Sequence, residues 1–176
     1  PLIVYHVLNL VRAGITDIVI NHSHLGHMID EALGDEPFIA LSGDIYAPYF
    51  DFEQCKDALK DIDAVGQPYP LDQRDIAWVY LTPNPWHNPE GDFGMTMYTL
   101  SNAGTPKWNF ANIGVYRPEM FEGIKPGEFA KLGPLMRKYI DLGRVGGELY
   151  DGPWVNVGTM QQLEELNAPL SARAKK

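Results

Sequence analysis

The first candidate for metal chemistry is a carboxylate that follows an apolar run. Residues 38–41 are typical of a buried strand, and Ser42, Gly43 and Asp44 come directly after them. A solvated turn would explain this ending, because Gly and Asp are common turn residues. A metal-binding carboxylate would also explain it, since open α/β sheets bind ligands at the carboxyl ends of their strands. Taken alone, this stretch leaves both interpretations open.

A second apolar stretch, at 154–159, is interrupted by an amide. Asn156 lies between Val155 and Val157, so in a strand its side chain points to the face opposite theirs. Backbone groups could satisfy the amide, as buried polar groups require. Its oxygen could instead ligate a hard cation, which accepts carbonyl donors. This second oxygen ligand favours the metal interpretation of Asp44.

Three histidines, His22, His24 and His27, stand within six residues and invite comparison with a zinc site. Their spacing fits zinc poorly, because no cysteine or further ligand pattern stands nearby. We therefore expect Asn21 or Ser23 to cap the helix that follows.

Two other polar interruptions, at 91–93 and 109–114, stand beside aromatic strands. They contain Gly91, Asp92, Asn109, Asn112 and Gly114. These residues could be hairpin turns. They could also line a sugar pocket, where Asn and Asp bind hydroxyl groups and an aromatic ring such as Trp108 packs on the sugar. The sequence leaves both possibilities open.

Helices and strands alternate along the chain, which predicts an α/β fold with a parallel sheet and crossover connections. Gly14 ends the first helix, and Thr159 is expected to cap the last. The expected helices cover residues 2–13, 27–33, about 52–59, 129–142 and the segment after 159. The expected strands cover 15–20, 38–41, 76–81, 95–100, 110–116 and the short stretch at 154–157, with a loop at 64–75.

Composition limits the class of protein. With 176 residues, of which 45% are hydrophobic, the chain is long enough for one well-buried domain, expected over 1–170 with a polar tail at 171–176. A formal charge of −9 argues against nucleic acid as a partner, because phosphate contacts need clustered Lys and Arg. The single cysteine, Cys55, excludes an internal disulfide. No leader and no apolar run of about 20 residues is evident, so a cytoplasmic protein without a membrane partner is expected.

The order of the motifs resembles that of the sugar nucleotidyltransferases, which join a sugar 1-phosphate to a nucleoside triphosphate and release pyrophosphate. The matching motifs are VINHSHLGHMI at 19–29, the strand ending in SGD at 42–44, GDF at 91–93, FANIGVYRPEMFEG at 110–123 and GELYDGPWVNVGT at 147–159. The similarity runs from Pro1 to about Asn167 and is greatest to the branch that acts on N-acetylmuramate 1-phosphate. It implies a three-layer, Rossmann-like, mostly parallel mixed sheet with helices on both faces.

The resemblance also implies an activity and a site. It predicts a Mg²⁺-dependent enzyme that transfers uridylyl from UTP to a sugar 1-phosphate, in the recycling of cell-wall sugars. It assigns Mg²⁺ to Asp44, and the family's second metal carboxylate is replaced here by Asn156, which brings no charge and should bind metal more weakly. The substrate contacts that it implies are Asn21, Gly43, Gly91, Asp92, Asn109, Asn112, Gly114 and Glu148.

Two parts of the family pattern are missing, and they leave alternatives open. The family's glycine-rich nucleotide loop is absent before Pro1, and a further Gly-Gly loop is absent between residues 35 and 36. We expect that the sequence joins separate segments of a longer protein. If it is complete, a non-catalytic sugar-phosphate or nucleotide-sugar binding module of the same fold is the alternative. An unrelated metal-dependent hydrolase using Asp44, His22 and His24 is a third possibility.

Overall fold

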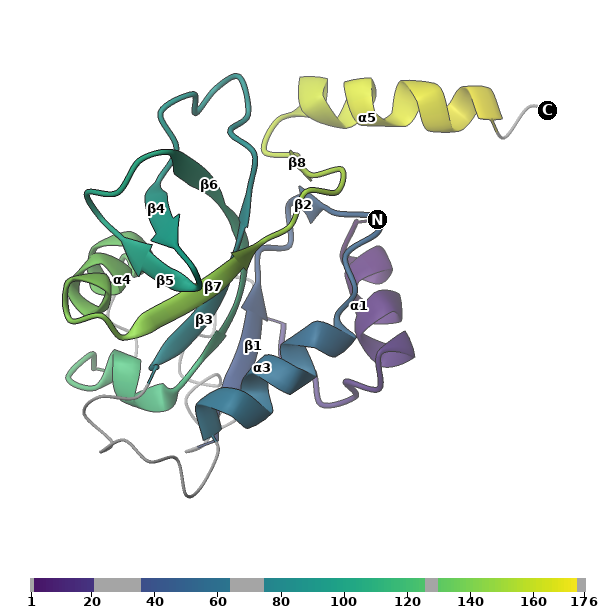
Figure 1. The fold of residues 1–176 in the computed structure, drawn as a ribbon. Coiled ribbons are helices and arrows are strands. Elements are labelled where there is room, and N and C mark those ends of the chain that lie inside the picture. Colours follow the sequence, from purple (N-terminus) through teal and green to yellow (C-terminus); the bar gives the residue numbers. More distant parts are fainter. Residues whose placement is uncertain (1, 21–35, 64–74, 126–129, 174–176) are drawn as a thin grey trace.

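The structure is a computed structural model that describes residues 2–20, 36–63, 75–125 and 130–173. Its centre is a mixed six-stranded sheet with the strand order β1-β6-β3-β7-β5-β4 (Figure 1). The strands are β1 (Phe38–Leu41), β3 (Ala77–Thr82), β4 (Phe93–Thr96), β5 (Thr99–Ser101), β6 (Lys107–Tyr116) and β7 (Val145–Leu149).

Most strands of this sheet run in one direction. β6 is antiparallel to β1, β3 and β4, and β5 is antiparallel to β7 and β4, whereas β3 and β7 pair in parallel. Consequently β1, β3, β7 and β4 share a direction, and β6 and β5 oppose them. The expected mostly parallel mixed sheet is confirmed in this sense.

The sheet separates two apolar clusters because its side chains alternate between its faces. On β3, Tyr80 belongs to one cluster, and Val79 and Leu81 belong to the other. On β6, Ile113 and Tyr116 divide in the same way. A central strand therefore needs apolar residues at nearly every position, which explains its near-continuous hydrophobic run.

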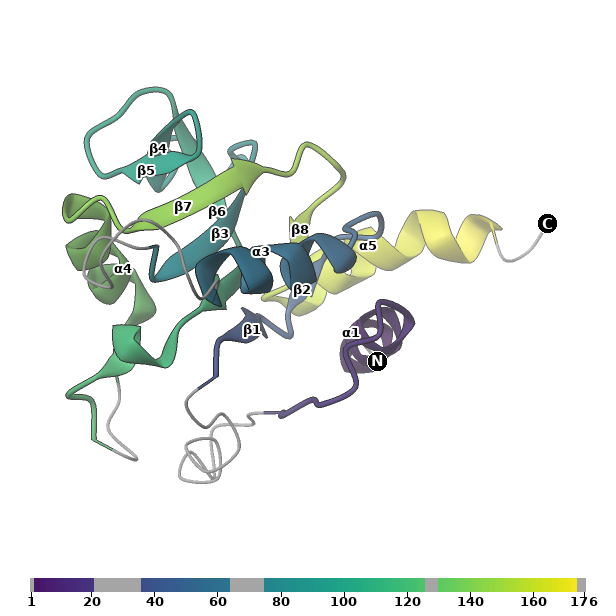
Figure 2. The same ribbon diagram turned by 60° about the horizontal axis from the view of Figure 1, so that its bottom comes forward.

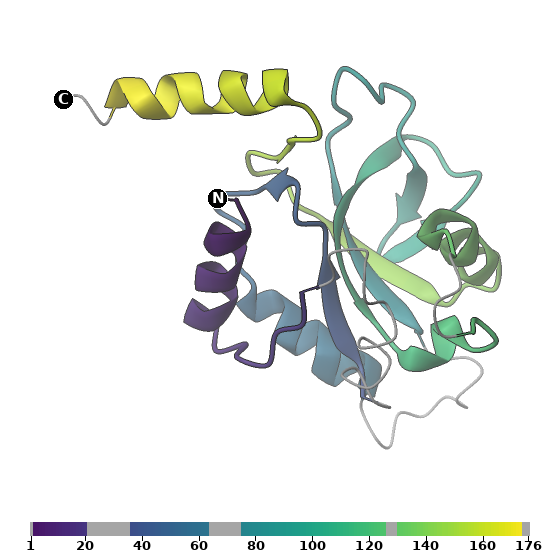
Figure 3. The same ribbon diagram turned by 180° about the vertical axis from the view of Figure 1, so that it is seen from behind.

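Helices cover both clusters and produce the three expected layers. α1 (Leu2–Arg12) and α3 (Glu53–Asp63) lie on one side of the sheet, and α4 (Leu132–Asp141) lies on the other (Figure 3). The Nζ of Lys56 in α3 donates to the carbonyl oxygen of Ala13 at 2.9 Å. This bond fixes the end of α1 against α3, which lie close together in Figure 2.

A smaller two-stranded sheet joins two segments that are distant in the sequence. β2 (Ile45–Tyr46) pairs antiparallel with β8 (Val155–Asn156), and α5 (Met160–Arg173) follows β8 and projects away from the main sheet (Figure 1). Thr159 caps α5 as expected, because its Oγ1 accepts a hydrogen bond from the backbone nitrogen of Gln162 at 3.2 Å. No described helix is long and apolar enough to cross a membrane.

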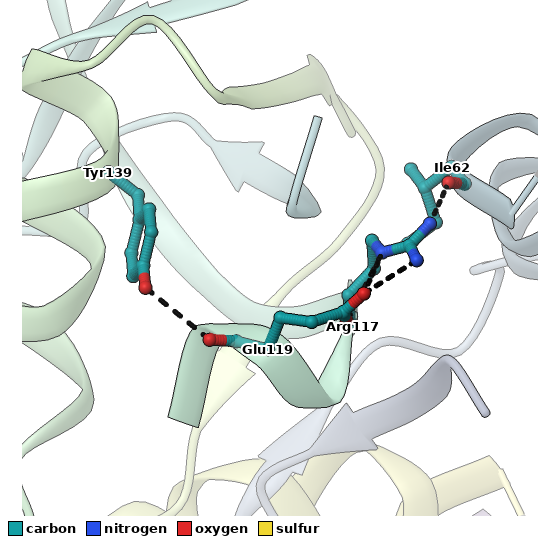
Figure 4. Close-up of polar contacts among 4 residues, drawn as sticks. All are labelled: Ile62, Arg117, Glu119 and Tyr139. Atoms are coloured by element: carbon teal, nitrogen blue, oxygen red, sulfur yellow. Dashed lines mark hydrogen bonds and ion pairs between the residues drawn. The ribbon is translucent and has the colours of Figure 1, made fainter. Parts of the chain in front are cut away.

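An arginine fixes the short helix η2 (Pro118–Phe121) to the layer formed by α3. Arg117 binds the carboxylate of Glu119 at 2.6 Å and donates to the carbonyl oxygen of Ile62 at 2.7 Å (Figure 4). On the other side, the hydroxyl of Tyr139 in α4 donates to the carbonyl oxygen of Glu119 at 3.4 Å. These contacts connect the layers at the edge of the sheet.

Most of the expected elements are present, and two expectations are wrong. The strand expected at 15–20 does not form: no described strand pairs with it, although Ile15 and Ile18 pack against the core. A strand requires a neighbour for its backbone groups, and an apolar pattern does not supply one. The continuous strand expected over 95–100 is instead a hairpin of β4 and β5, which turns at Met97 with a φ of +55°. The expected helix at 27–33 and most of the loop at 64–75 lie outside the described residues, as does residue 35, which flanks the expected gap.

Candidate active site

The turn after β1 and strand β8 form one edge of the site. Asp44 is exposed, and its carbonyl oxygen accepts a hydrogen bond from the backbone nitrogen of Val157 at 2.6 Å. The next residue, Ile45, pairs with Asn156. The two segments predicted to bind metal therefore lie side by side, although they come from opposite halves of the chain.

Asn156 presents an oxygen that can bind a cation. Its Oδ1 is buried and has no hydrogen-bond partner in the part of the chain that the structure describes. A buried amide oxygen without a partner destabilises the fold unless a ligand binds to it. This oxygen, and the carboxylate of Asp44 on the adjoining segment, are donors of the kind that Mg²⁺ accepts.

The rest of a metal coordination shell is not supplied by acidic or histidine side chains of the described residues. None of them form a group of three or more His, Cys, Asp or Glu that could hold a metal ion. Mg²⁺ commonly retains waters and binds through one or two protein ligands together with substrate phosphates. The pair Asp44 and Asn156 fits that mode of binding.

A histidine that the sequence analysis did not single out packs against this turn. His6 in α1 is only 3% exposed. Burial lowers the pKa of His6, while the nearby backbone of Ile45 and Gly43 and the charge of Asp44 act in the opposite direction. The imidazole ring of His6 therefore supports the turn after β1 from the side of α1. Helical periodicity placed residue 6 in α1 but gave no sign that it contacts a segment so distant in sequence.

A pocket of about 360 Å³, which we call the polar pocket, opens beside Asn156. Its size lies in the range of about 300–1,000 Å³ that is usual for small-molecule sites. Four residues predicted from the sequence line it: Asp92, Asn109, Asn112 and Asn156. The remaining lining residues are His87, Asn88, Phe93, Phe110, Leu132, Gly133, Met136, Arg137 and Trp154.

Two of the predicted polar residues use hydrogen bonds to build the pocket wall. The Oδ2 of Asp92 accepts from the backbone nitrogen of Phe110 at 2.8 Å. Asn109 is 6% exposed, accepts from the Nδ2 of Asn88 at 2.9 Å and donates to the carbonyl oxygen of Phe110 at 2.9 Å. These bonds hold the loop before β4 against β6, so both side chains shape the wall whether or not they also contact a substrate.

Asn112 connects the pocket to the turn that carries Asp44. Its carbonyl oxygen accepts from the backbone nitrogen of Ser42 at 3.0 Å, and its φ is +58°. Asn tolerates this left-handed conformation better than most residues. The polar pocket and the turn after β1 are therefore joined through the backbone of β6.

The other predicted substrate residues lie apart from the pocket wall. Gly43 belongs to the turn beside Asp44, and Gly91, with a φ of +66°, lies two residues before β4. Gly114 is buried in β6, where a Cβ would lie 2.6 Å from the hydroxyl oxygen of Tyr116. Glu148 lies in β7 opposite Tyr80. Asn21, like the three clustered histidines, lies outside the described residues.

The pocket contains residues that the sequence analysis did not identify. Arg137 and Met136 come from α4, and Trp154 donates from its Nε1 to the carbonyl oxygen of Ala111 at 2.9 Å. Trp154 belongs to the motif that contains Asn156, so it could have been found there. Arg137 had no such signal, because a basic residue on a helix is usually solvated. Trp108, which the sequence offered as a possible platform for a sugar, is partly buried against the apolar core and does not line this pocket.

The arrangement of layers and the site at the strand ends define a class of protein. No protein-family model matches the chain. A glucose-1-phosphate thymidylyltransferase structure from Bacillus anthracis, in complex with a sucrose, superimposes with a TM-score of 0.59 at 14% identity, covering 94% of this chain and 70% of that one. An apo UDP-glucose pyrophosphorylase superimposes with a TM-score of 0.55 at 13% identity, covering 85% of this chain and 61% of that one. The fold is that of the nucleotide-diphospho-sugar transferases.

Sequence similarity identifies the family within that fold. In an alignment 208 residues long, the chain is 33% identical to the N-acetylmuramate alpha-1-phosphate uridylyltransferase of Neisseria meningitidis serogroup B (strain ATCC BAA-335 / MC58). The alignment covers 96% of this chain and 84% of that relative. The chain belongs to the sugar-1-phosphate nucleotidyltransferase family, as its motifs predicted.

Proposed function

We propose that the protein transfers a uridylyl group from UTP to N-acetylmuramate 1-phosphate and releases pyrophosphate. The observation that carries this proposal is the 33% identity to a relative named for that reaction, spread over 96% of the chain. The polar pocket beside Asn156 supports it, since its size and its amide and carboxylate lining suit a sugar. Such an activity belongs to the recycling of cell-wall sugars in the cytoplasm, where UTP is available.

The proposed reaction is an in-line displacement at phosphorus. An oxygen of the sugar phosphate forms a bond to the α-phosphorus of UTP, and the bond from that phosphorus to the oxygen bridging to the β-phosphorus breaks. Pyrophosphate leaves with the electron pair. No general base is required, because a phosphate monoester is largely ionised at neutral pH.

The protein's contribution is alignment of two anionic substrates. The polar pocket holds the sugar, and the turn after β1 carries Asp44 beside Asn156, where the two phosphates must meet. Mg²⁺, held by Asp44 and the Oδ1 of Asn156, would supply charge neutralisation when bound. Because Asn156 is uncharged, the substrate phosphates would share in holding the ion.

The test is pyrophosphate release by the full-length protein with UTP, N-acetylmuramate 1-phosphate and Mg²⁺. We expect turnover that depends on both substrates and is lost in an Asp44→Asn variant. An Asp57→Asn variant is the matched control, because Asp57 is an exposed carboxylate on α3 that pairs only with Lys60 among the described residues. Absence of turnover with intact binding of the sugar phosphate would favour the non-catalytic binding module, which the uncharged Asn156 makes the second candidate.

A further inference from the structure

One charged group of the polar pocket has no part in the proposed reaction. Arg137 is the pocket's only permanent cation among the described lining residues, and it comes from α4. Asp92 is the only carboxylate among them. Apart from these two charged groups the described lining is amide, aromatic, imidazole and apolar, so Arg137 is the group that could recognise an anionic part of a ligand.

The guanidinium of Arg137 is held in place before any ligand binds. It lies over the ring of Phe93, 4.8 Å from the ring centroid, and it donates to the Oδ1 of Asn102 at 3.2 Å. The Nδ2 of Asn102 in turn donates to the carbonyl oxygen of Arg137 at 2.9 Å and to Asp141 at 2.7 Å. Asn102 thereby fixes both the backbone and the head group of Arg137, which reduces the entropy lost on binding.

The same guanidinium keeps hydrogen-bonding capacity for a ligand. Its contacts with the carbonyl oxygen of Asp92 are long, at 3.5 Å from both terminal nitrogens. Within the described parts of the chain, Arg137 forms no ion pair with a carboxylate. A ligand carboxylate would form shorter, charge-assisted bonds with this planar group than the backbone carbonyl does.

Arg137 also lies on a different wall from the proposed reaction centre. α4 carries Arg137 and β8 carries Asn156, and the two elements stand apart in Figures 1 and 2. A sugar whose 1-phosphate is directed toward Asn156 therefore extends its other substituents toward α4. The charge that Arg137 would meet there belongs to a ring substituent and not to the reacting phosphate.

We propose that Arg137 binds the carboxylate of the lactyl ether at O3 of the sugar and thereby selects N-acetylmuramate 1-phosphate over N-acetylglucosamine 1-phosphate. This inference rests on the proposed function, because it names the selective group of that same site. The two sugars differ only by the lactyl group. An arginine held ready for a carboxylate gains little from the sugar that lacks one, so discrimination of about 10- to 100-fold is expected.

The experiment compares the two sugar phosphates on the same enzyme preparation. The ratio of kcat/KM for N-acetylmuramate 1-phosphate to that for N-acetylglucosamine 1-phosphate is measured for wild type, Arg137→Gln, Arg137→Lys and Lys138→Gln. We expect the ratio to fall at least tenfold in Arg137→Gln, mainly through KM, to be intermediate in Arg137→Lys and to be unchanged in Lys138→Gln. If a variant is only partly folded, both kcat/KM values fall by the same factor, so their ratio does not change. Equal losses on both sugars would overturn the proposal, as would an unchanged ratio in Arg137→Gln.

A binding measurement separates failure of this inference from failure of the proposed function. Calorimetric titration compares N-acetylmuramate with N-acetylglucosamine, without UTP, on wild type and Arg137→Gln. If the wild type releases no pyrophosphate yet prefers N-acetylmuramate through Arg137, the uridylyltransferase activity is wrong and the recognition stands. If the wild type is active and neither ratio nor affinity depends on Arg137, the recognition is wrong and the activity stands. A wild type that neither turns over nor prefers N-acetylmuramate overturns both.

Discussion

The backbone nitrogen of Val157 donates a hydrogen bond to the carbonyl oxygen of Asp44 at a distance of 2.6 Å. Asn156, the neighbour of Val157, pairs with Ile45, the neighbour of Asp44. A strand-end turn from the first half of the chain is thus fixed to the strand before the last helix. The proposed phosphate chemistry depends on this ladder, because it brings two oxygen ligands from distant segments to one edge of the fold.

Replacing Asp44 with asparagine should abolish most of the proposed activity without unfolding the protein. We expect kcat to fall about 100-fold or more, since a charged metal ligand stabilises a reaction between anions by several kcal/mol. The melting temperature should change little, because the side chain is exposed. Pyrophosphate release and thermal unfolding are measured together, with Asp57→Asn as the control. Similar activities in the two variants would contradict the assignment.

Restoring a carboxylate at position 156 should strengthen metal binding. In Asn156→Asp we expect half-maximal activity at a lower Mg²⁺ concentration than in wild type, and in Asn156→Ala at a higher one. Because the Oδ1 of Asn156 is buried, the aspartate should lower the melting temperature without metal and recover it when Mg²⁺ is added. A Mg²⁺ requirement that is the same in all three proteins would exclude position 156 as a ligand.

Replacing Gly91 with alanine should destabilise the fold as well as the pocket. Its φ is +66°, and a Cβ would lie 2.7 Å from the Oδ1 of Asn84 and 2.8 Å from the carbonyl carbon of Lys107. We expect the free energy of unfolding to fall by about 1–3 kcal/mol. Gly143→Ala is the control, because its φ is also positive, at +68°, but nothing lies within 4 Å of its Cβ position. Unchanged stability in Gly91→Ala, with only a raised KM, would favour a direct substrate contact.

The single cysteine should resist alkylation in the native protein. Cys55 is fully buried, and burial raises the pKa of its thiol to about 12. Since the thiolate is the reactive form, we expect no iodoacetamide adduct between pH 7 and 9 until denaturant unfolds the chain. Intact mass is the measurement, and it should then show one adduct. Rapid labelling of the folded protein would mean that the α3 layer opens readily.

The ion pair between Arg117 and Glu119 should contribute stability that depends on pH. The hydrogen bond from Arg117 lowers the pKa of the Glu119 carboxyl. The contribution is therefore complete above the unfolded carboxyl pKa of about 4.3 and is lost as pH falls through the lower folded value. Because the Glu119 side chain is 43% exposed, Glu119→Gln should cost only about 0.5–1 kcal/mol at pH 7.

Chemical denaturation at several pH values measures this effect. The difference in the free energy of unfolding between wild type and Glu119→Gln should shrink as pH falls below 4. The exposed pair Asp57 and Lys60 supplies the control, since Asp57→Asn should leave stability unchanged within error. If the wild type stays more stable than Glu119→Gln by the same free energy in acid, the charge of the carboxylate is not the source of that stability.

Several features of this protein follow from local sequence. The apolar run of β1 with its polar ending, the continuous apolar pattern of β3 and the capping threonine of α5 were predicted because period and turn chemistry are local properties. The same patterns located Asp44 and Asn156 and placed Asp92, Asn109 and Asn112 in candidate positions. The family followed from the order of these motifs and agrees with the sequence comparison.

Other features were decided only by tertiary structure. Residues 15–20 can form a strand only if a neighbouring strand pairs with them, and their apolar pattern does not show whether such a neighbour exists. The adjacency of Asp44 to Val157, the use of the Asn109 amide within the pocket wall and the presence of Arg137 in that pocket all depend on contacts between segments distant in sequence. Local sequence specifies which groups a residue offers, whereas the packing of distant elements determines which of those groups find partners and which remain available to a ligand.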